Sequence, residues 1–343
     1  MNQTGKAVGP RPVSGRTNPL PILQVTTGFW ASQALMTAVE LRIFTVLFGG
    51  PKTAADVATE VGADPVALEA LLDANCALGF LHRQGDRYRN DDVSNQFLVE
   101  GSPGSYVDLV RCMRDPLYHL WENLSDTVRT GKASASAEGK TELATARAYH
   151  NGYYATMMRV AEILDLEYSA YGRILDLGSH TGAGALCLAR RYPHFQATIQ
   201  DRALFQPLAE EFIRTLKLDD RVRFAPGDPD HAQPDGNYDL VLLPHFLSQR
   251  GRDAIPGILA NVVASLRKGG TVLVTEFVLE ESRAEPKEAA LFRLNVLAAH
   301  GSAAAGALTR AELVRFLQDA GLTDVDMVGL PMFGITAITA CKS

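Results

Sequence analysis

Residues 173–202, RILDLGSHTGAGALCLARRYPHFQATIQDR, decide the fold of this 343-residue chain. The first apolar run of this stretch ends at Asp176, and the second ends at Asp201. Between the two runs lie a helical stretch and a tight loop with three glycines, Gly178, Gly182 and Gly184. The pattern predicts a β-loop-α-β unit with an acidic residue at the end of each strand, as in Rossmann-like α/β domains.

The glycine-rich loop favours a nucleoside ligand. Glycines let the backbone approach a ligand closely and turn sharply into the following helix. Asp201 can accept hydrogen bonds from the hydroxyl groups of a ribose. The run G-S-H-T-G-A-G differs from the G-x-G-x-x-G of a dinucleotide site, and no Walker lysine follows it. Asp176 would repel phosphates, but it suits a cationic sulfonium or ammonium group.

Composition argues against several classes of protein. The formal net charge of −6 is unlike the basic footprint of a nucleic-acid-binding protein. The four cysteines are scattered without metal-ligand spacing, so we expect reduced thiols and no metal site. No run is long and apolar enough to span a bilayer. We therefore expect a cytoplasmic protein that binds neither membranes nor nucleic acids, with residues 1–19 as a disordered leader.

Residues 20–100 predict a mainly helical N-terminal domain. Residues 20–48 carry apolar residues at helical spacing and few charges, so we expect a buried helix that packs against a second copy of the chain. Capped helices near 53–58 and 66–78, followed by a hairpin over 79–89, form a winged-helix pattern. The second of these helices has acidic residues and no Lys or Arg. Dimerisation is therefore favoured over the alternative of a DNA-binding repressor.

Residues 101–168 predict two long helices, over 102–131 and 141–166, with many aromatic and basic side chains. One interpretation is an ordinary amphipathic helix pair. The other is that some of these side chains line a substrate pocket over the C-terminal domain, residues 169–343. The side chains that we expect to contact a small-molecule substrate are Arg111, Arg114, Tyr118, His119, Tyr153, Met157, Gln249 and Asn295.

The order of these segments resembles the winged-helix O-methyltransferase family, which uses S-adenosylmethionine (SAM) and includes plant caffeate and bacterial polyketide O-methyltransferases. The resemblance covers roughly residues 20–341. Beyond the glycine-rich loop it rests on five segments, at 224–228, 238–243, 266–276, 308–322 and 338–340. It implies a Rossmann-like SAM-binding domain behind a mainly α winged-helix dimerisation domain, in a homodimer. Residues 266–270 are expected as a turn that precedes a strand.

The resemblance also implies which residues bind SAM. Asp176 and the loop glycines are expected around the methionine part, Asp201 at the ribose and Asp228 near the adenine. The full expected set is Asp176, Gly178, Ser179, Gly182, Asp201, Arg202, Gly227, Asp228, Pro229 and Pro244.

One position departs from the family's pattern. Members usually carry a run close to N-x-L-H-x-W, in which the histidine is the general base. Here residues 245–250 read HFLSQR, which places Ser248 at the position of the base and His245 three residues before it. The family's acid is kept as Glu276. We therefore expect the catalytic groups among His245, Ser248 and Glu276, and His119 and His300 are alternative bases.

The displaced histidine favours an acceptor that carries no proton. A thioether sulfur attacks a methyl group without losing a proton, whereas a hydroxyl oxygen needs a base. One bacterial branch of the family methylates the sulfur of 4-methylthio-2-hydroxybutyrate in dimethylsulfoniopropionate synthesis, and Arg111 or Arg114 could clamp its carboxylate. The alternatives are O- or C-methylation of a natural-product intermediate, or a homologue that binds SAM without transferring methyl.

Overall fold

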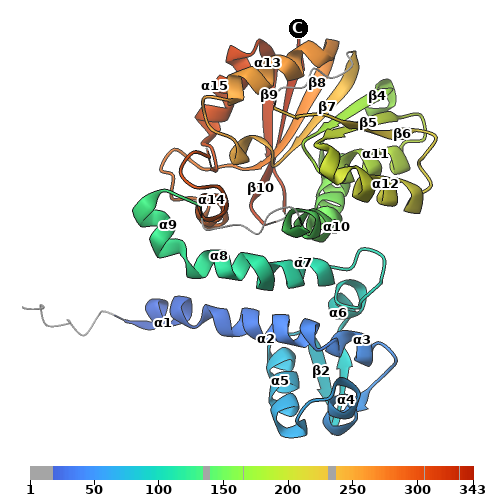
Figure 1. Cartoon of the computed structure of the whole chain (residues 1–343), viewed down its shortest axis with the longest axis vertical. Helices are drawn as coiled ribbons and strands as arrows, with labels where there is room; N and C mark the ends of the chain where they lie inside the picture. Colours follow the sequence, from blue (N-terminus) through green and yellow to red (C-terminus); the bar gives the residue numbers. More distant parts are fainter. Residues whose placement is uncertain (1–17, 134–139, 165, 231–236, 305, 332) are drawn as a thin grey trace, which may run out of the picture. The chain divides into compact units, whose positions relative to one another are not determined.

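The computed structural model describes residues 18–133, 140–164, 166–230, 237–304, 306–331 and 333–343 (Figure 1). The chain divides into two compact units, residues 1–101 and 102–343. All but the last two residues of the expected leader lie outside the described residues. No helix among the described residues is long and apolar enough to cross a membrane.

The first unit opens with three helices, α1 (Leu20–Thr26), α2 (Gly28–Glu40) and α3 (Ile43–Leu47). The prediction of one buried helix over 20–48 is therefore wrong. Arg42 adopts a left-handed φ of 59°, which ends the α2 helix, and α1 has no buried residue. An apolar stripe becomes buried only where the chain supplies a partner for it, and burial starts at Ala38, within α2.

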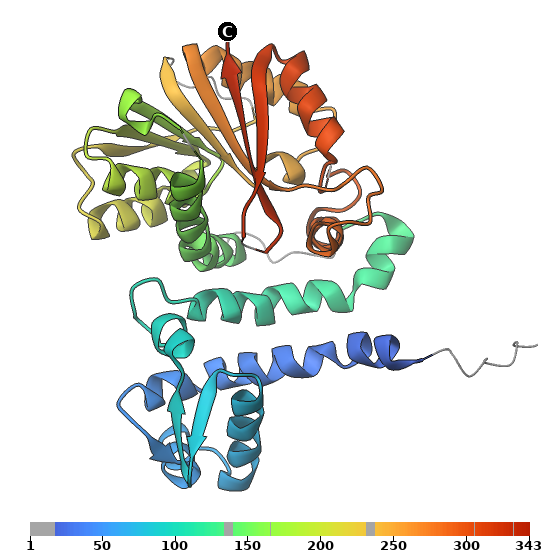
Figure 2. The same ribbon diagram turned by 180° about the vertical axis from the view of Figure 1, so that it is seen from behind.

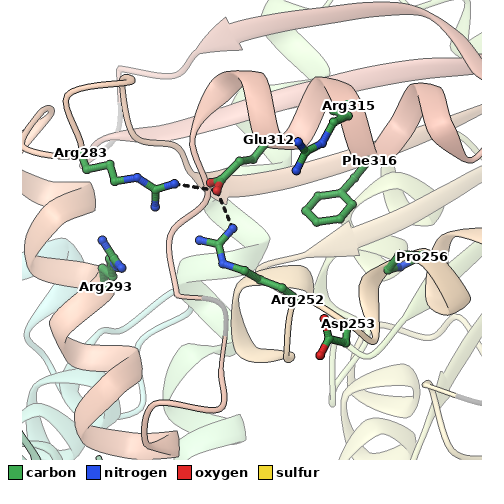
Figure 3. Close-up of a pocket in the computed structure, with 8 residues that line it drawn as sticks. All are labelled: Arg252, Asp253, Pro256, Arg283, Arg293, Glu312, Arg315 and Phe316. Carbon is green, nitrogen blue, oxygen red and sulfur yellow. Dashed lines mark hydrogen bonds and ion pairs between the residues drawn. The ribbon is translucent and has the colours of Figure 1, made fainter.

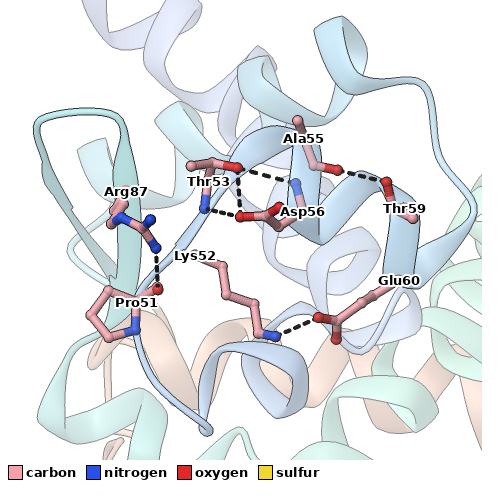
Figure 4. A network of polar contacts seen from close by, with 8 residues as sticks. All are labelled: Pro51, Lys52, Thr53, Ala55, Asp56, Thr59, Glu60 and Arg87. Carbon is pink, nitrogen blue, oxygen red and sulfur yellow. Dashed lines mark hydrogen bonds and ion pairs between the residues drawn. The ribbon is translucent and has the colours of Figure 1, made fainter.

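The remainder of the first unit has the predicted order of two capped helices and a hairpin. Its elements are β1 (Lys52–Thr53), α4 (Ala54–Val61), α5 (Pro65–Ala77), β2 (Leu81–Gln84), β3 (Arg87–Asn90) and α6 (Asp92–Phe97). Thr53 and Asp56 form a reciprocal capping box at the start of α4 (Figure 4). Asp64 caps α5 through the backbone N–H groups of Val66 and Ala67. The hairpin extends into a three-stranded sheet because β1 pairs with β3.

The second unit begins with α7 (Val107–Cys112), a turn η1 (Met113–Leu117), α8 (Tyr118–Glu122), α9 (Leu124–Thr130) and α10 (Lys140–Ile163). The single helix predicted over 102–131 is wrong. Asp115 has non-helical dihedral angles, with φ −147° and ψ 116°, and it precedes Pro116. A residue before proline is driven out of the helical region by contact with the proline ring. The helix predicted over 141–166 is confirmed as α10.

The central sheet has seven strands in the order β6-β5-β4-β7-β8-β10-β9. They are β4 (Arg173–Leu177), β5 (Gln196–Asp201), β6 (Val222–Pro226), β7 (Tyr238–Pro244), β8 (Leu266–Phe277), β9 (Leu322–Gly329) and β10 (Ile335–Lys342). The first five in spatial order are parallel, and β10 pairs antiparallel with both β8 and β9. The turn expected at 266–270 is part of β8, because Leu266 already pairs with Tyr238 across a register shift.

Helices cover both faces of this sheet, as the two opposite views show (Figures 1 and 2). Helices α10, α11 (Ala183–Arg191) and α12 (Gln206–Thr215) contribute to one apolar core, and α13 (Ile255–Ser265) and α15 (Arg310–Asp319) contribute to the other. Helix α14 (Lys287–His300) precedes α15. The carboxyl ends of the parallel strands lie at the same end of the sheet, and such folds bind their ligands there.

Candidate active site

Asp176 occupies the buried end of β4. Its Oδ2 accepts a hydrogen bond of 2.9 Å from the backbone N–H of Ala185 in the first turn of α11. Its Oδ1 is buried and has no hydrogen-bond partner among the described residues. Burial raises the pKa of this carboxyl to about 6. One oxygen is therefore held by the fold, and the other is available to a polar or cationic ligand.

The loop after β4 can be built only with glycine at two positions. Gly178 and Gly182 have φ of +70° and +72°. A Cβ on Gly178 would lie 2.2 Å from the Phe246 ring, and one on Gly182 would lie 2.1 Å from Cδ1 of Ile199. The loop thus approaches its neighbours closely. The buried Oγ of Ser179, in the same loop, has no hydrogen-bond partner in the part of the chain that the structure describes.

Asp201 joins the loops that follow three strands. Its Oδ2 accepts the backbone N–H of His180 at 2.7 Å, and its Oδ1 accepts the N–H of Arg202 at 2.7 Å. Its backbone carbonyl accepts the N–H of Gly227 at 2.9 Å. Each carboxylate oxygen has a second lone pair, so the fixed carboxylate can still accept two ribose hydroxyl groups.

The other expected cofactor residues also lie at the carboxyl ends of the parallel strands. The Arg202 guanidinium pairs with Glu142 of α10 and lies 5.0 Å from the centre of the Phe205 ring. Asp228 follows β6, and its Oδ1 accepts the N–H of Asp230 at 3.0 Å, with Pro229 between them. Pro244 is the last residue of β7.

His245 follows β7 directly and has a strained backbone. Its φ is +50°, a left-handed value that is uncommon outside glycine. The backbone N–H of His245 donates a 2.8 Å hydrogen bond to the Thr275 carbonyl, which holds the strained backbone in place. The imidazole also packs between two rings: its centroid lies 5.4 Å from that of Tyr153 and 5.3 Å from that of Phe277. Burial lowers the pKa of this histidine to about 4, so the ring is uncharged at neutral pH.

Glu276 lies beside His245 at the end of β8. Its Oε1 accepts the backbone N–H of Ser248 at 3.1 Å, and its Oε2 lies 3.9 Å from Nδ1 of His245. That separation is too long for a hydrogen bond, and neither atom has another partner within the described residues. Burial raises the pKa of Glu276 to about 7. Two buried ionisable groups thus face each other. Near pH 7 the imidazole is uncharged and the carboxyl is partly ionised.

Two of the expected substrate residues contact His245, and a third lies near Asp176. Tyr153 stacks on His245, and the Gln249 side chain donates to the His245 carbonyl at 2.7 Å. Met157 is buried, and a Cβ on Gly184 would lie 3.3 Å from its Cε and 3.2 Å from Oδ2 of Asp176. Tyr153 and Gln249 therefore lie at His245, and Met157 lies beside Gly184 and Asp176.

The remaining expected substrate residues are not brought together in this way. His119 is exposed and bonds to Glu122 at 2.8 Å, and Asn295 accepts the indole N–H of Trp121 at 3.0 Å. The three further residues lie on three successive elements. Arg111 lies on α7, Arg114 lies in the turn, and Tyr118 begins α8.

The sequence did not predict which residues outside the glycine-rich loop form a hydrogen bond to it. His150 of α10 bonds to Oγ1 of Thr181 at 2.9 Å and stacks on Phe212 with a centroid distance of 3.5 Å. The two bonded residues are 31 positions apart in the sequence. Only the packing of α10 against the sheet reveals the contact. The aromatic density of residues 149–154 was the only available signal.

Two family models match the chain. An O-methyltransferase dimerisation domain matches residues 23–100, and an O-methyltransferase domain matches residues 121–322. The chain is 33% identical to the tetracenomycin polyketide synthesis 8-O-methyl transferase of Streptomyces glaucescens, over 90% of this chain and 92% of that one. The chain belongs to the O-methyltransferase family.

Further relatives agree with this assignment. The chain is 32% identical to the N,N-dimethyltransferase OxyT of Streptomyces rimosus, over 76% of this chain and 78% of that one. The structure superposes on human N-acetylserotonin methyltransferase in complex with SAM with a TM-score of 0.83 and 26% identity, over 96% of this chain and 100% of that one. The chain is a SAM-dependent methyltransferase, and SAM is its cofactor. The predicted fold class is confirmed.

Proposed function

We propose that this enzyme methylates a hydroxyl oxygen of a small aromatic molecule of the kind made in natural-product pathways. The observation that carries the proposal is the buried pair of His245 and Glu276 at the carboxyl ends of β7 and β8. A buried base and a buried acid are of use where a proton must leave the acceptor.

The chemistry of the acceptor explains the need for this pair. SAM supplies an electrophilic methyl group on a sulfonium sulfur. A hydroxyl group loses its proton when its oxygen is methylated, and the uncharged imidazole of His245 can accept that proton. Glu276 can then stabilise the imidazolium, because its Oε2 faces Nδ1. In this proposal Ser248 acts through its backbone N–H, which orients the carboxylate.

The fit of SAM to the loop residues rests on two features. Two buried polar atoms, Oδ1 of Asp176 and Oγ of Ser179, have no hydrogen-bond partner among the described residues. The carboxylate of Asp201 keeps lone pairs for a ribose. We propose that Asp176, Gly178 and Ser179 hold the methionine part, that Asp201 holds the ribose, and that Asp228 lies near the adenine.

The relatives support a hydroxyl acceptor over a thioether. Their names describe methylation of oxygen in polyketide and naphthoate compounds and, for OxyT, of nitrogen. The thioether acceptor expected from Ser248 has no support among them. The position of His245 beside Glu276 offers a base from three residues earlier in the chain. Methylation of a sulfur acceptor is therefore a result that would contradict the proposal.

The test is the rate of S-adenosylhomocysteine (SAH) release with phenols, naphthols and thioethers as acceptors. We expect turnover with a hydroxyl-bearing aromatic, and a loss of about 10²- to 10⁴-fold in kcat for His245→Ala. His82→Ala is the matched control because that histidine is exposed on β2 of the other unit. Turnover with thioethers alone, or full activity in His245→Ala, contradicts the proposal.

A further inference from the structure

A second site lies in the methyltransferase unit, apart from the residues described above. Four arginines line a cavity of about 610 Å³ (Figure 3). Arg252 precedes α13, Arg283 lies between β8 and α14, Arg293 is on α14, and Arg315 is on α15. Four separate segments thus bring guanidinium groups to one open cavity.

Two of these arginines share one carboxylate. Oε1 of Glu312 accepts from Nη1 of Arg252 at 2.6 Å and from Nη2 of Arg283 at 2.7 Å. Its Oε2 accepts the backbone N–H of Thr309 at 2.8 Å, in the capping box that starts α15. Glu312 is therefore fully engaged, and it neutralises only one of the two positive charges beside it.

The other two arginines lack an acidic partner. Across the described part of the chain, no ion pair joins Arg293 or Arg315 to a carboxylate. The cavity lining carries four arginines against two carboxylates, Asp253 and Glu312. Like charges that line one cavity repel one another, and a bound anion would relieve that repulsion.

We propose that this cavity binds a small molecule that carries a phosphate monoester or diphosphate group. The planar guanidinium fork matches phosphate oxygens with paired hydrogen bonds. A phosphate group of charge near −2 complements the excess of two positive charges in the lining. The cavity lies in the size range of small-molecule sites, and Phe316 and Pro256 give it an apolar wall for the rest of the ligand.

This proposal is independent of the methyl acceptor. None of the lining residues belongs to the glycine-rich loop or to the centre formed by His245 and Glu276. Binding at the cavity can therefore be measured without methyl transfer, and the result does not depend on which atom the enzyme methylates.

The experiment is calorimetric titration of the full-length protein with inorganic pyrophosphate. Saturating SAH is present so that the cofactor site is filled, and sodium chloride keeps the ionic strength constant. We expect saturable binding of one pyrophosphate per chain. Arg293→Gln and Arg315→Gln should each weaken it about tenfold, because each removes a charge-assisted contact. Both arginines are exposed on helices, so thermal unfolding should remain close to wild type.

Arg310→Gln is the matched control, since Arg310 lies on the same helix as Arg315 but does not line the cavity. It should bind pyrophosphate with the affinity of the wild type. Absence of saturable binding would overturn the proposal. Equal weakening in Arg310→Gln would overturn it too, because the effect would then come from net charge alone.

Discussion

At the residue scale, burial shifts the acids and bases of the site towards their uncharged forms. It raises the pKa of Asp176 to about 6 and that of Glu276 to about 7, and it lowers the pKa of His245 to about 4. An isolated buried charge is costly, so burial shifts each pKa in the direction that disfavours the charged form. Near pH 7 the His245 ring is therefore uncharged, whereas Glu276 is partly ionised.

The pH dependence of turnover should report Glu276. Its carboxyl ionises as the pH rises through about 7, and the carboxylate then stabilises a protonated His245. We expect kcat/KM for a hydroxyl acceptor to rise with pH across this region in the wild type. Glu276→Gln should remove the rise. A profile of unchanged shape in that variant would show that Glu276 does not assist the base.

The same carboxyl should make folding stability pH-dependent. Its pKa in the folded protein lies above the ordinary 4.5, so its contribution to stability is complete below pH 4.5 and is lost as the pH rises through about 7. Replacement by glutamine should therefore raise Tm more at pH 8 than at pH 5. Thermal unfolding at the two pH values measures this difference. A larger gain at pH 5 would contradict the raised pKa.

Asp201 should control affinity for SAM. Asp201→Asn replaces one carboxylate oxygen with an amide nitrogen, so one of the backbone N–H groups of His180 and Arg202, or one ribose hydroxyl, loses its acceptor. We expect SAM binding to weaken by about 1.5–3 kcal/mol in titration calorimetry. Asp219→Asn, on an exposed loop, should bind normally. Wild-type affinity in Asp201→Asn would remove this residue from the site.

At the scale of elements, the loop between β4 and α11 depends on glycine. Gly182→Ala places a Cβ against Ile199 at a left-handed φ, so we expect a loss of about 1–3 kcal/mol in the free energy of unfolding, with weaker SAM binding. Gly257→Ala is the control, because that glycine is exposed in α13 with open space around it. It should gain about 0.5–1 kcal/mol in urea unfolding. Equal effects at both positions would argue against a close-packed loop.

The elements that could be predicted are those whose signals are local. In the unit from β4 to β5, the strand ends, the glycines and the helix are all encoded within thirty residues. Thr53 and Asp64 are N-cap residues, and they predict the starts of α4 and α5. The break at Asp115 has a local signal too, because a proline follows it. Local signals of this kind therefore predict most element boundaries.

The candidate site could be predicted only in part, because half of it depends on packing between distant segments. Asp176 and Asp201 follow from strand ends. Two contacts depend on where α10 crosses the sheet. They are the stacking of Tyr153 on His245 and the hydrogen bond between His150 and Thr181. A sequence pattern gives the face of a helix but not its rotation against a neighbour.

At the scale of the whole molecule, the exposed apolar surface of α1 and α2 indicates a protein–protein interface. Val25 is 81% exposed, Ile22 67% and Trp30 65%, in a region that matches an O-methyltransferase dimerisation domain. We expect a homodimer that buries this surface, and Trp30→Glu should shift light scattering towards monomer. Val66→Glu, at a 76% exposed apolar residue on α5, should stay dimeric. A monomeric wild type at micromolar concentration would contradict this prediction.

The central claim is that the methyl group goes to oxygen with His245 as its base. The most direct measurement is carbon-13 NMR of the product formed from SAM labelled in its methyl carbon, with a hydroxyl-bearing aromatic acceptor. The account predicts a methyl ether, in which the labelled carbon couples through oxygen to the ring carbon that bore the hydroxyl. A labelled carbon bonded to a sulfonium sulfur, to nitrogen or directly to a ring carbon would contradict it.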